Sequence, residues 1–159
     1  MFRKIRREKQ ALFDDECREI LAASGLGVLA VQGDGGYPYA VPLNYVYLDG
    51  SLYYHSATEG HKIDALRRDD RARFSVIGEM RPVTEKFSTH YTSVTVFGRV
   101  EFVTDEAERL RALTALTESL AGGESEESKR AEVESCTLRE HVAVLALRPE
   151  HISGKRSRF

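Results

Sequence analysis

Short turns separate the apolar runs in the first part of this chain, and their spacing constrains the fold more than any other feature. GVLAVQ (Gly27–Gln32) is rich in strand-forming residues and is followed by the turn GDGG. The long run YPYAVPLNYVY (Tyr37–Tyr47), the turn LDGS and the run LYYHS come next. Asp-Gly suits the primed turns of β-hairpins. Strands joined in this way pair antiparallel, because a parallel pair needs a long crossover connection.

Three further β-rich runs follow along the chain. They are ARFSVIG (Ala72–Gly78), TSVTVFGRVEFV (Thr92–Val103) and HVAVLALRP (His141–Pro149), while GEMRPVTEKFSTH is expected to be a loop. Together the runs make about six strands. An antiparallel sheet of this kind closes readily into a barrel. The sequence therefore predicts a mainly β fold, a six-stranded antiparallel barrel with peripheral helices, in a single domain over residues 1–159.

Helical patterns lie between and around these strands. One short helix is expected over Asp14–Ser24 and another over His61–Arg68. A third starts at Asp105, with Glu108 spaced to complete a capping box. A polar linker and a weaker helix then reach Ser135. The third helix carries an apolar stripe at helical spacing, formed by Leu110, Leu113, Leu116 and Leu120.

Composition and charge indicate an ordinary globular protein. Hydrophobic residues make up 42% and charged residues 30% of the chain. The formal net charge of −2 argues against a dedicated nucleic-acid binder, and the basic ends MFRKIRREK and GKRSRF are expected to be solvated tails, with nucleic-acid binding as the alternative. No run approaches the ~18 apolar residues of a membrane span, and the start is unlike a secretory signal. We therefore expect a cytoplasmic protein with no membrane partner.

Several familiar catalytic and cofactor motifs are absent. The segment Gly25–Gly27 follows a helix and precedes a strand, the reverse of the order in a dinucleotide fingerprint. The GDGG turn lacks the lysine of a phosphate loop, and neither GxSxG nor HExxH occurs. His55 and His61 are six residues apart, and the two cysteines lack CxxC spacing. These spacings match no usual zinc or haem signature, so we expect no metal site.

The proline in VPLNY is the first unusual feature. Pro42 falls in the middle of a predicted strand, yet it cannot donate a ladder hydrogen bond. An edge strand or a bulge would explain it without any function. The alternative is that the sheet leaves backbone groups unpaired here for a planar ligand, since bulges often mark ligand approach. A flavin ring suits such a place, because its pyrimidine edge carries alternating donors and acceptors.

The stretch HSATEGHK is the second feature. A loop of small polar residues, Ser56 to Gly60, leads into a helix whose first residues are His61 and Lys62. The first turn of a helix has unpaired N–H groups and the positive end of the dipole, which together bind phosphate. The alternative is a solvated basic helix, since several arginines follow. A flat ring near Pro42 and a phosphate at His61 and Lys62 together describe FMN.

At this point the sequence resembles the pyridoxamine 5′-phosphate oxidase-like family of FMN-binding split barrels. It is most similar to the nitroimidazole-resistance (Nim-type) branch. The residues that carry the resemblance are YAVPLNYVY, the DG turn, LYYHSATEGHKIDALRRDDRARFSV and SVTVFGRVEFV, within a span from about Phe13 to Pro149. The HSATEGHK stretch is the most specific of these; the strands alone would not carry it.

The resemblance implies a homodimer, with barrel packed on barrel and each FMN at the interface. The VPLN run would line the flavin ring, HSA would lie along the ring and ribityl chain, and HK would hold the phosphate. The long fifth strand would add one or two contacts. The implied cofactor-binding residues are Val41, Pro42, Leu43, Asn44, His55, Ser56, Ala57, His61, Lys62, Tyr91 and Ser93.

The resemblance also implies a function, an FMN-dependent oxidoreductase. It would pass electrons from NAD(P)H to a small electron-poor acceptor such as a nitroimidazole or a quinone. His55 is the candidate proton donor or substrate partner, and a structural His55 bonded to the backbone is the alternative. Pyridoxamine phosphate oxidation is not expected, because the chain has no Trp and ends in ISGKRSRF. The other functional alternative is a flavin- or haem-binding protein without turnover.

Overall fold

The computed structural model describes residues 2–139 and 141–157, which form one antiparallel sheet with four α-helices around it. The strands are β1 (Leu26–Gln32), β2 (Pro38–Asn44), β3 (Val46–Leu48), β4 (Ser51–Ala57), β5 (Arg71–Val83), β6 (Ser88–Phe102) and β7 (Val142–Arg156). Their order across the sheet is β2-β1-β5-β6-β7-β4-β3. The prediction of a mainly β antiparallel barrel is confirmed.

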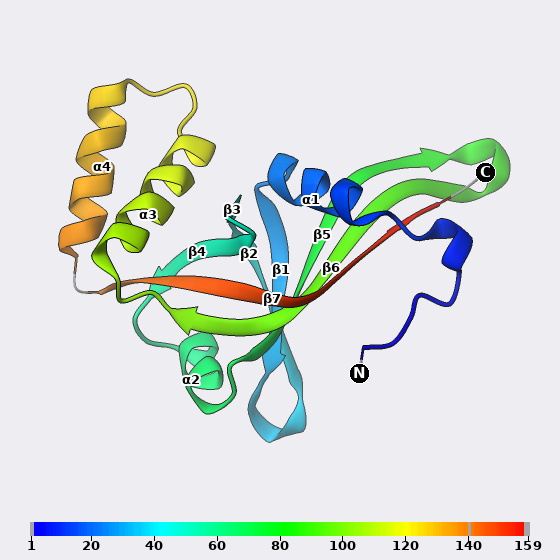
Figure 1. Cartoon of the computed structure of the whole chain (residues 1–159), viewed down its shortest axis with the longest axis horizontal. Coiled ribbons are helices and arrows are strands. Elements are labelled where there is room, and N and C mark those ends of the chain that lie inside the picture. The colour runs from blue at the N-terminus through cyan, green and yellow to red at the C-terminus, as the bar shows by residue number, and fades with distance from the viewer. Residues whose placement is uncertain (1, 140, 158–159) are drawn as a thin grey trace.

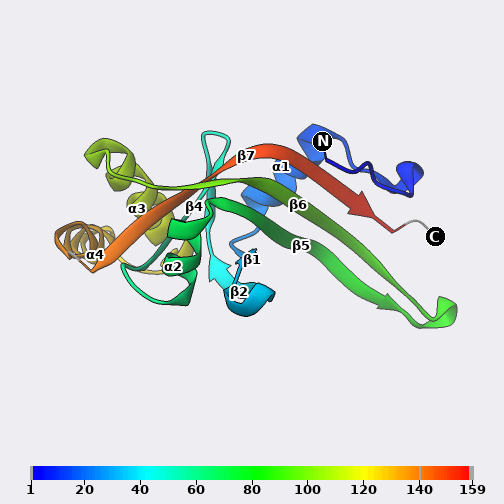
Figure 2. The ribbon, with the colours of Figure 1, turned by 90° about the horizontal axis from the view of Figure 1, so that it is seen from below.

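The helices occupy different ends of the molecule. They are α1 (Asp14–Ala23), α2 (His61–Arg68), α3 (Glu106–Leu120) and α4 (Glu126–Leu138). In both views α3 and α4 stand at one end, while the β5–β6 hairpin extends as an arm at the opposite end (Figures 1 and 2). The predicted helix His61–Arg68 is confirmed residue for residue. No helix in the described part of the chain is long and apolar enough to cross a membrane.

The described residues form seven strands, so the prediction of six was wrong by one. The run predicted as one strand, Tyr37–Tyr47, is two strands, β2 and β3, which lie at opposite edges of the sheet. Tyr45 makes the step between them. Its N–H donates to Gly25 O at 3.0 Å and its hydroxyl donates to Leu21 O at 2.9 Å. Tyr45 is buried and is the one residue between β2 and β3. No Gly or Pro therefore marks the boundary between the two strands in the sequence.

Closure of the barrel is incomplete. β3 pairs with β4 from Val46↔Tyr53 to Leu48↔Ser51, and β2 pairs with β1 along its whole length. No ladder joins β2 to the second half of β4 within the described residues. The turn that joins β3 to β4 is a primed hairpin turn as predicted, since Asp49 and Gly50 have φ angles of 50° and 79°. The barrel is therefore split between β2 and the end of β4.

The main core fills the barrel and reaches α1 and α2. One glycine is essential to it: a Cβ on Gly27 would lie 2.1 Å from the ring of Phe74, which packs against Tyr45 and Tyr54. Ile63 and Leu66 anchor α2 to this core. A second cluster holds α3 and α4 against the sheet through Tyr53, Val103, Ala112, Leu113, Val133, Val144 and Ala146.

Two segments extend the sheet beyond its predicted ends. GEMRPVTEKFSTH is not a loop, because β5 continues to Val83 and pairs with β6 through Val83↔Ser88. The arm shows no apolar alternation because both of its faces are largely exposed. The C-terminal segment is not a solvated tail either: β7 passes Pro149 and pairs with β6 up to Arg156. Apolar residues alternate with polar ones only in a strand that buries one face. A strand with both faces exposed, as in the arm, therefore gives no such pattern in the sequence.

Candidate functional site

A shallow, open hollow of about 430 Å³ lies at the split in the barrel. Four parts of the chain meet there. The end of β4 supplies His55, Ser56 and Ala57, the following loop supplies Glu59 and Gly60, α2 supplies His61 and Lys62, and β2 supplies Tyr39. Five of the predicted cofactor-binding residues therefore lie in one hollow: His55, Ser56, Ala57, His61 and Lys62.

The β4 side of the split presents unpaired backbone groups. Thr58 N–H donates to His141 O at 3.2 Å, next to the pair Ala57↔Val142. In an antiparallel ladder both polar groups of a residue face the same neighbour, and residues alternate between the two sides. The even residues of β4 therefore bond to β7, and the N–H and C=O groups of His55 and Ala57 point toward the gap.

The β2 side presents unpaired groups as well, and this explains Pro42. Gly33 N–H donates to Tyr37 O at 2.9 Å, and Tyr45 N–H donates to Gly25 O at 3.0 Å. The odd residues of β2 therefore bond to β1, and the even ones, Pro42 included, face the gap. The register with β1 is continuous, so the edge-strand interpretation holds and a bulge is absent. Pro42 costs the ladder nothing, and its carbonyl remains available to a ligand.

Side chains of β2 divide between the two faces of the sheet. Val41 and Leu43 are half-buried and pack against the main core, whereas Pro42 and Asn44 are exposed. Val41 and Leu43 can therefore contribute to the split chiefly by fixing the strand, while Pro42 and Asn44 present groups to its outer rim.

The N-terminus of α2 lies open at the hollow. Gly60 precedes the helix with φ 108°, a conformation that favours glycine, and provides no side-chain cap. The first intrahelical bond runs from Asp64 N–H to Gly60 O, so the N–H groups of His61, Lys62 and Ile63 have no partner within the helix. These groups and the helix dipole favour an anion.

Lys62 adds a cation at the same place. Its side chain is half-buried, and burial lowers the pKa of its ammonium group. The described residues provide no carboxylate that pairs with it, although ion pairs are common on the rest of α2. A desolvated ammonium without a counter-ion costs stability, so the hollow is electrostatically incomplete without an anion.

His61 is held by two neighbours. Its Nε2 lies 3.5 Å from Asp34 Oδ2, and its ring lies 4.2 Å from that of Tyr39, measured between centroids. Asp34 also accepts a hydrogen bond from Arg68 Nη2 at 2.7 Å. Asp34 belongs to the β1–β2 turn and was missed in the sequence, where GDGG indicated only a turn. No local signal reveals that this turn folds against α2.

His55 projects from the same hollow without a local partner. Its side chain is exposed, and no hydrogen bond to it is found in the described part of the chain. The interpretation of His55 as a structural residue bonded to the backbone is therefore not supported. The imidazole is accessible to a molecule that enters the split.

Tyr91 and Ser93 lie elsewhere, on the arm side of β6. Tyr91 N–H donates to Ser157 Oγ at 2.8 Å, and Ser93 pairs with Ile77 and Lys155. Along β7, Lys155 is eight residues beyond Leu147, which pairs with the start of β4. At ~3.3 Å per residue this is roughly 26 Å. A single chain therefore does not bring these two residues to the hollow.

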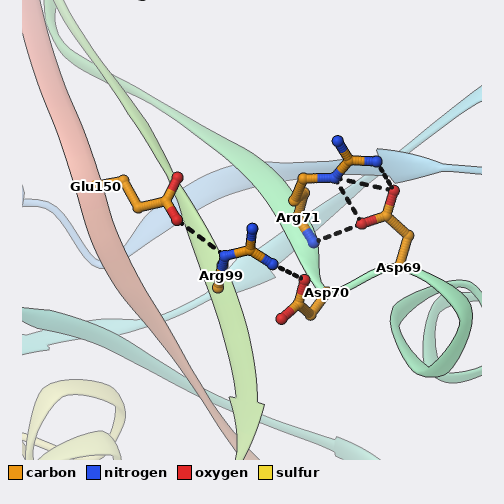
Figure 3. A network of polar contacts seen from close by, with 5 residues as sticks. All are labelled: Asp69, Asp70, Arg71, Arg99 and Glu150. Atoms are coloured by element: carbon orange, nitrogen blue, oxygen red, sulfur yellow. Dashed lines mark hydrogen bonds and ion pairs between the residues drawn. The ribbon is translucent and has the colours of Figure 1, made fainter. Parts of the chain in front are cut away.

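An ion-pair network fixes the segment that follows α2 (Figure 3). Asp69 accepts hydrogen bonds from the backbone and side chain of Arg71, and this contact lowers the pKa of Asp69 to about 2. Arg99 joins Asp70 to Glu150 at 2.6 and 2.9 Å. These contacts link β5, β6 and β7 to the two residues that follow α2. They therefore fix the C-terminal end of the helix whose N-terminus lies at the hollow.

A second hollow, of about 360 Å³ and mostly apolar, lies on the outer face of β1, β2 and β5. It is lined in part by Leu26, Val28, Pro42 and Ile77, of which the three large side chains are 40–62% exposed. Met80 extends this apolar face along the arm. Adjacent exposed apolar residues of this kind commonly mark an interface.

Metal binding finds no support in the side-chain arrangement. Within residues 2–139 and 141–157, no group of three or more His, Cys, Asp and Glu side chains is placed to hold a metal ion. Cys17 is buried and Cys136 is half-buried, and both are free thiols.

The fold and the split define a class, the antiparallel split barrels, and comparison with known families agrees. The profile of the family described as pyridoxamine 5′-phosphate oxidase matches residues 14–156. The chain belongs to this family. A comparison with curated proteins gives no match.

Solved structures extend the comparison. A FAD-binding protein from Mesorhizobium loti is 27% identical, with a TM-score of 0.69 over 94% of this chain and 98% of that one. A candidate 5-nitroimidazole antibiotic resistance protein from Bacteroides thetaiotaomicron is 24% identical, with a TM-score of 0.73 over 92% and 86%. A FAD- and haem-binding protein from Mycobacterium smegmatis is 24% identical, with a TM-score of 0.72 over 96% and 75%. The last two establish similarity of fold alone.

Proposed function

We propose that this protein is an FMN-dependent oxidoreductase that takes electrons from NAD(P)H and reduces a small, flat, electron-poor acceptor. One observation carries the proposal: the unpaired end of β4 and the open start of α2 line one hollow, beside the free edge of β2, in a chain of this family. The edges suit the polar rim of a flavin ring, and Lys62 with the free N–H groups suits a phosphate.

The residues present fit the cofactor. The backbone of Pro42 to Asn44 and of His55 to Ala57 would hold the ring, with Val41 and Leu43 fixing β2 from the core side. Ser56 and Ala57 would lie beside the ribityl chain, and His61 and Lys62 would hold the phosphate. When bound, FMN supplies the capacity to accept a hydride and return electrons. The protein would bind and orient it.

His55 is the proposed contact with the acceptor. Its exposed imidazole stands next to the split and has no partner among the described residues, so it is able to donate a hydrogen bond or a proton to a reduced acceptor. A nitroimidazole or quinone offers oxygen atoms for such a bond. Assignment of the Bacteroides thetaiotaomicron protein to 5-nitroimidazole resistance supports this acceptor class.

The proposed assembly is a homodimer. The apolar outer face, formed by Leu26, Val28, Ile77 and Met80, would be covered by a second copy. Tyr91 and Ser93 cannot reach the hollow of their own chain, so in a dimer they would serve the other copy's cofactor. Ile77→Lys should give a monomer in sedimentation and weaken FMN binding. Leu138→Lys, at a position on α4 that is 75% exposed against 62% for Ile77, should leave the dimer intact.

Spectroscopy and anaerobic turnover test the function directly. Purified protein supplied with FMN should show protein-bound flavin absorption, and NADH or NADPH should bleach it without oxygen. Adding a 5-nitroimidazole or a quinone should restore the colour at a catalytic rate. A Soret band in place of flavin absorption would indicate haem binding, and bound flavin that neither donor bleaches would indicate cofactor binding without this turnover. Either result would contradict the proposal.

A further inference from the structure

The segment that precedes α1, residues 2–12, is held against the last strand of the sheet. Leu12 N–H donates to Gly154 O at 2.9 Å, and Ala11 forms an isolated antiparallel bridge with Lys155. The segment is therefore part of the folded surface and not the free tail that the sequence indicated. We call residues 2–12 the basic strap.

The apolar and the basic side chains of the strap have different surroundings. Phe2 stacks on His151, with 4.8 Å between ring centroids and 8° between ring planes, and Leu12 packs against the main core. Ile5 is half-buried. The basic side chains are all exposed: Arg3, Lys4, Arg6, Arg7 and Lys9. Apolar residues therefore dock the strap on the barrel, and its cations are left at the surface.

The five cations repel one another, and the described part of the protein does not neutralise them. Together with the one carboxylate of the strap, Glu8, they give it a net formal charge of +4, against −2 for the whole chain. Within residues 2–139 and 141–157 no ion pair joins any of the five to a carboxylate, whereas Arg156 beside the strap is paired with Glu16. Holding like charges together in a docked segment costs free energy, which a bound polyanion offsets.

We propose that the basic strap is a docking surface for nucleic acid, through contacts to the phosphodiester backbone. Three of the five cations are arginines, whose guanidinium groups hold a phosphate by two parallel hydrogen bonds. Duplex DNA carries one negative charge per ~1.7 Å of its axis, so several phosphates lie within reach of a segment of this length. An anionic membrane suits the strap less, because the apolar side chains that would enter a bilayer are used in docking to the barrel.

The strap is remote from the proposed flavin site of the same chain. Lys155, its partner on β7, is eleven residues beyond Val144, which pairs with His55. At ~3.3 Å per residue this separation is roughly 36 Å. Nucleic-acid binding at the strap would therefore not use that hollow, and it can be tested whether or not a flavin binds.

The experiment is a fluorescence-anisotropy titration of a labelled DNA duplex of about 20 base pairs with the full-length protein, repeated across a series of salt concentrations. The wild type should bind with a dissociation constant of about 1–100 μM at low salt, equally for two unrelated sequences. The logarithm of the affinity should fall with that of salt concentration with a slope of about −3 to −4, as expected for roughly four phosphate contacts. The triple variant Arg3→Gln, Arg6→Gln, Arg7→Gln should bind at least about tenfold more weakly, and its slope should be about 2–3 smaller in magnitude.

A charge-matched control separates the strap from the net charge of the protein. Arg111→Gln, Arg130→Gln, Arg139→Gln removes three exposed arginines from the α3–α4 end and should bind the duplex as the wild type does. Both triple variants should keep the wild-type unfolding temperature, because all six side chains are exposed. No anisotropy change with wild type at low salt would overturn the inference, and so would equal losses in the two triple variants. Binding to vesicles of phosphatidylserine and phosphatidylcholine without binding to the duplex would overturn it in favour of a membrane surface.

Discussion

Tyr53 and His55 lie two residues apart on the same face of β4, yet their surroundings are opposite. Tyr53 is almost fully buried, and its hydroxyl donates to Glu108 Oε1 at 2.7 Å. Arg148 donates to the same hydroxyl at 2.9 Å and to Glu108 at 2.6 Å. His55 is exposed, and no partner is found for it in the described residues. One position is closed by protein groups and the other is left open.

The helices beside these two residues differ in the same way. At α3, Asp105 caps the helix by accepting the N–H of Glu108 at 2.8 Å. The predicted capping box is only half formed, because the Glu108 carboxylate is used by Tyr53 and Arg148 instead. At α2, Gly60 provides no side-chain cap for the first turn, and no carboxylate among residues 2–139 and 141–157 pairs with Lys62. We infer that satisfied polar groups hold the α3 end together, while the α2 end is kept for a ligand.

The largest expected effect on stability comes from removing the Arg148 contacts beside α3. Arg148→Met should lower the free energy of unfolding by about 2–3 kcal/mol, since it leaves Glu108 and Tyr53 without their shared donor. The upper values for buried ion pairs do not apply, because the Arg148 side chain is 34% exposed. Chemical denaturation measures the change, and FMN affinity should stay within twofold.

Arg99→Met is the matched control for that variant. Arg99 also bridges two carboxylates, Asp70 and Glu150, but its side chain is 51% exposed and both partners are about half exposed. Its loss should cost less than about 1 kcal/mol, as surface ion pairs usually do. If both variants lost the same free energy of unfolding, the contacts of Arg148 with Tyr53 and Glu108 would contribute no more than an ordinary surface ion pair.

The closed end should also be sensitive to acid. Hydrogen bonds from Tyr53 and Arg148 lower the pKa of Glu108 from its ordinary value of 4.5. Its stabilising effect is therefore complete above pH 4.5 and is lost as the pH falls through the lower, folded-state pKa. Wild type should exceed Glu108→Gln in unfolding free energy by about 1–2 kcal/mol at pH 7. The difference should shrink on acidification; a constant difference from pH 7 to pH 3 would contradict the assignment.

The smallest effect is expected at the open end, and its sign is reversed. Without ligand, Lys62→Met should raise the free energy of unfolding by about 0.5–1 kcal/mol, because it replaces a half-buried, unpaired ammonium with an apolar group. Thermal unfolding of the apoprotein measures it. A clear loss of stability would show that the Lys62 ammonium already has a partner within the protein. The start of α2 would then not lack an anion.

The sequence predicted the regions whose signals are local. Tight turns gave the antiparallel order, and α2 was placed correctly because its loop and apolar positions lie together in the chain. The same closeness brought His55 and His61 to one hollow. Asp34 was missed because its contact with His61 depends on how a distant turn folds. The arm was missed because neither of its faces is buried, and the step at Tyr45 because one residue makes it without a turn motif.

The central claim is that the open end binds a flavin through its phosphate, and paired titrations of FMN and riboflavin test it most directly. Lys62→Met should weaken FMN binding by about 1.5–3 kcal/mol, a factor of roughly 10 to 150, and leave riboflavin affinity unchanged. Lys129→Met is the control, since Lys129 is a shielded lysine already paired with Glu118 and Glu126. Unchanged FMN affinity in Lys62→Met, or an equal loss for riboflavin, would contradict the account.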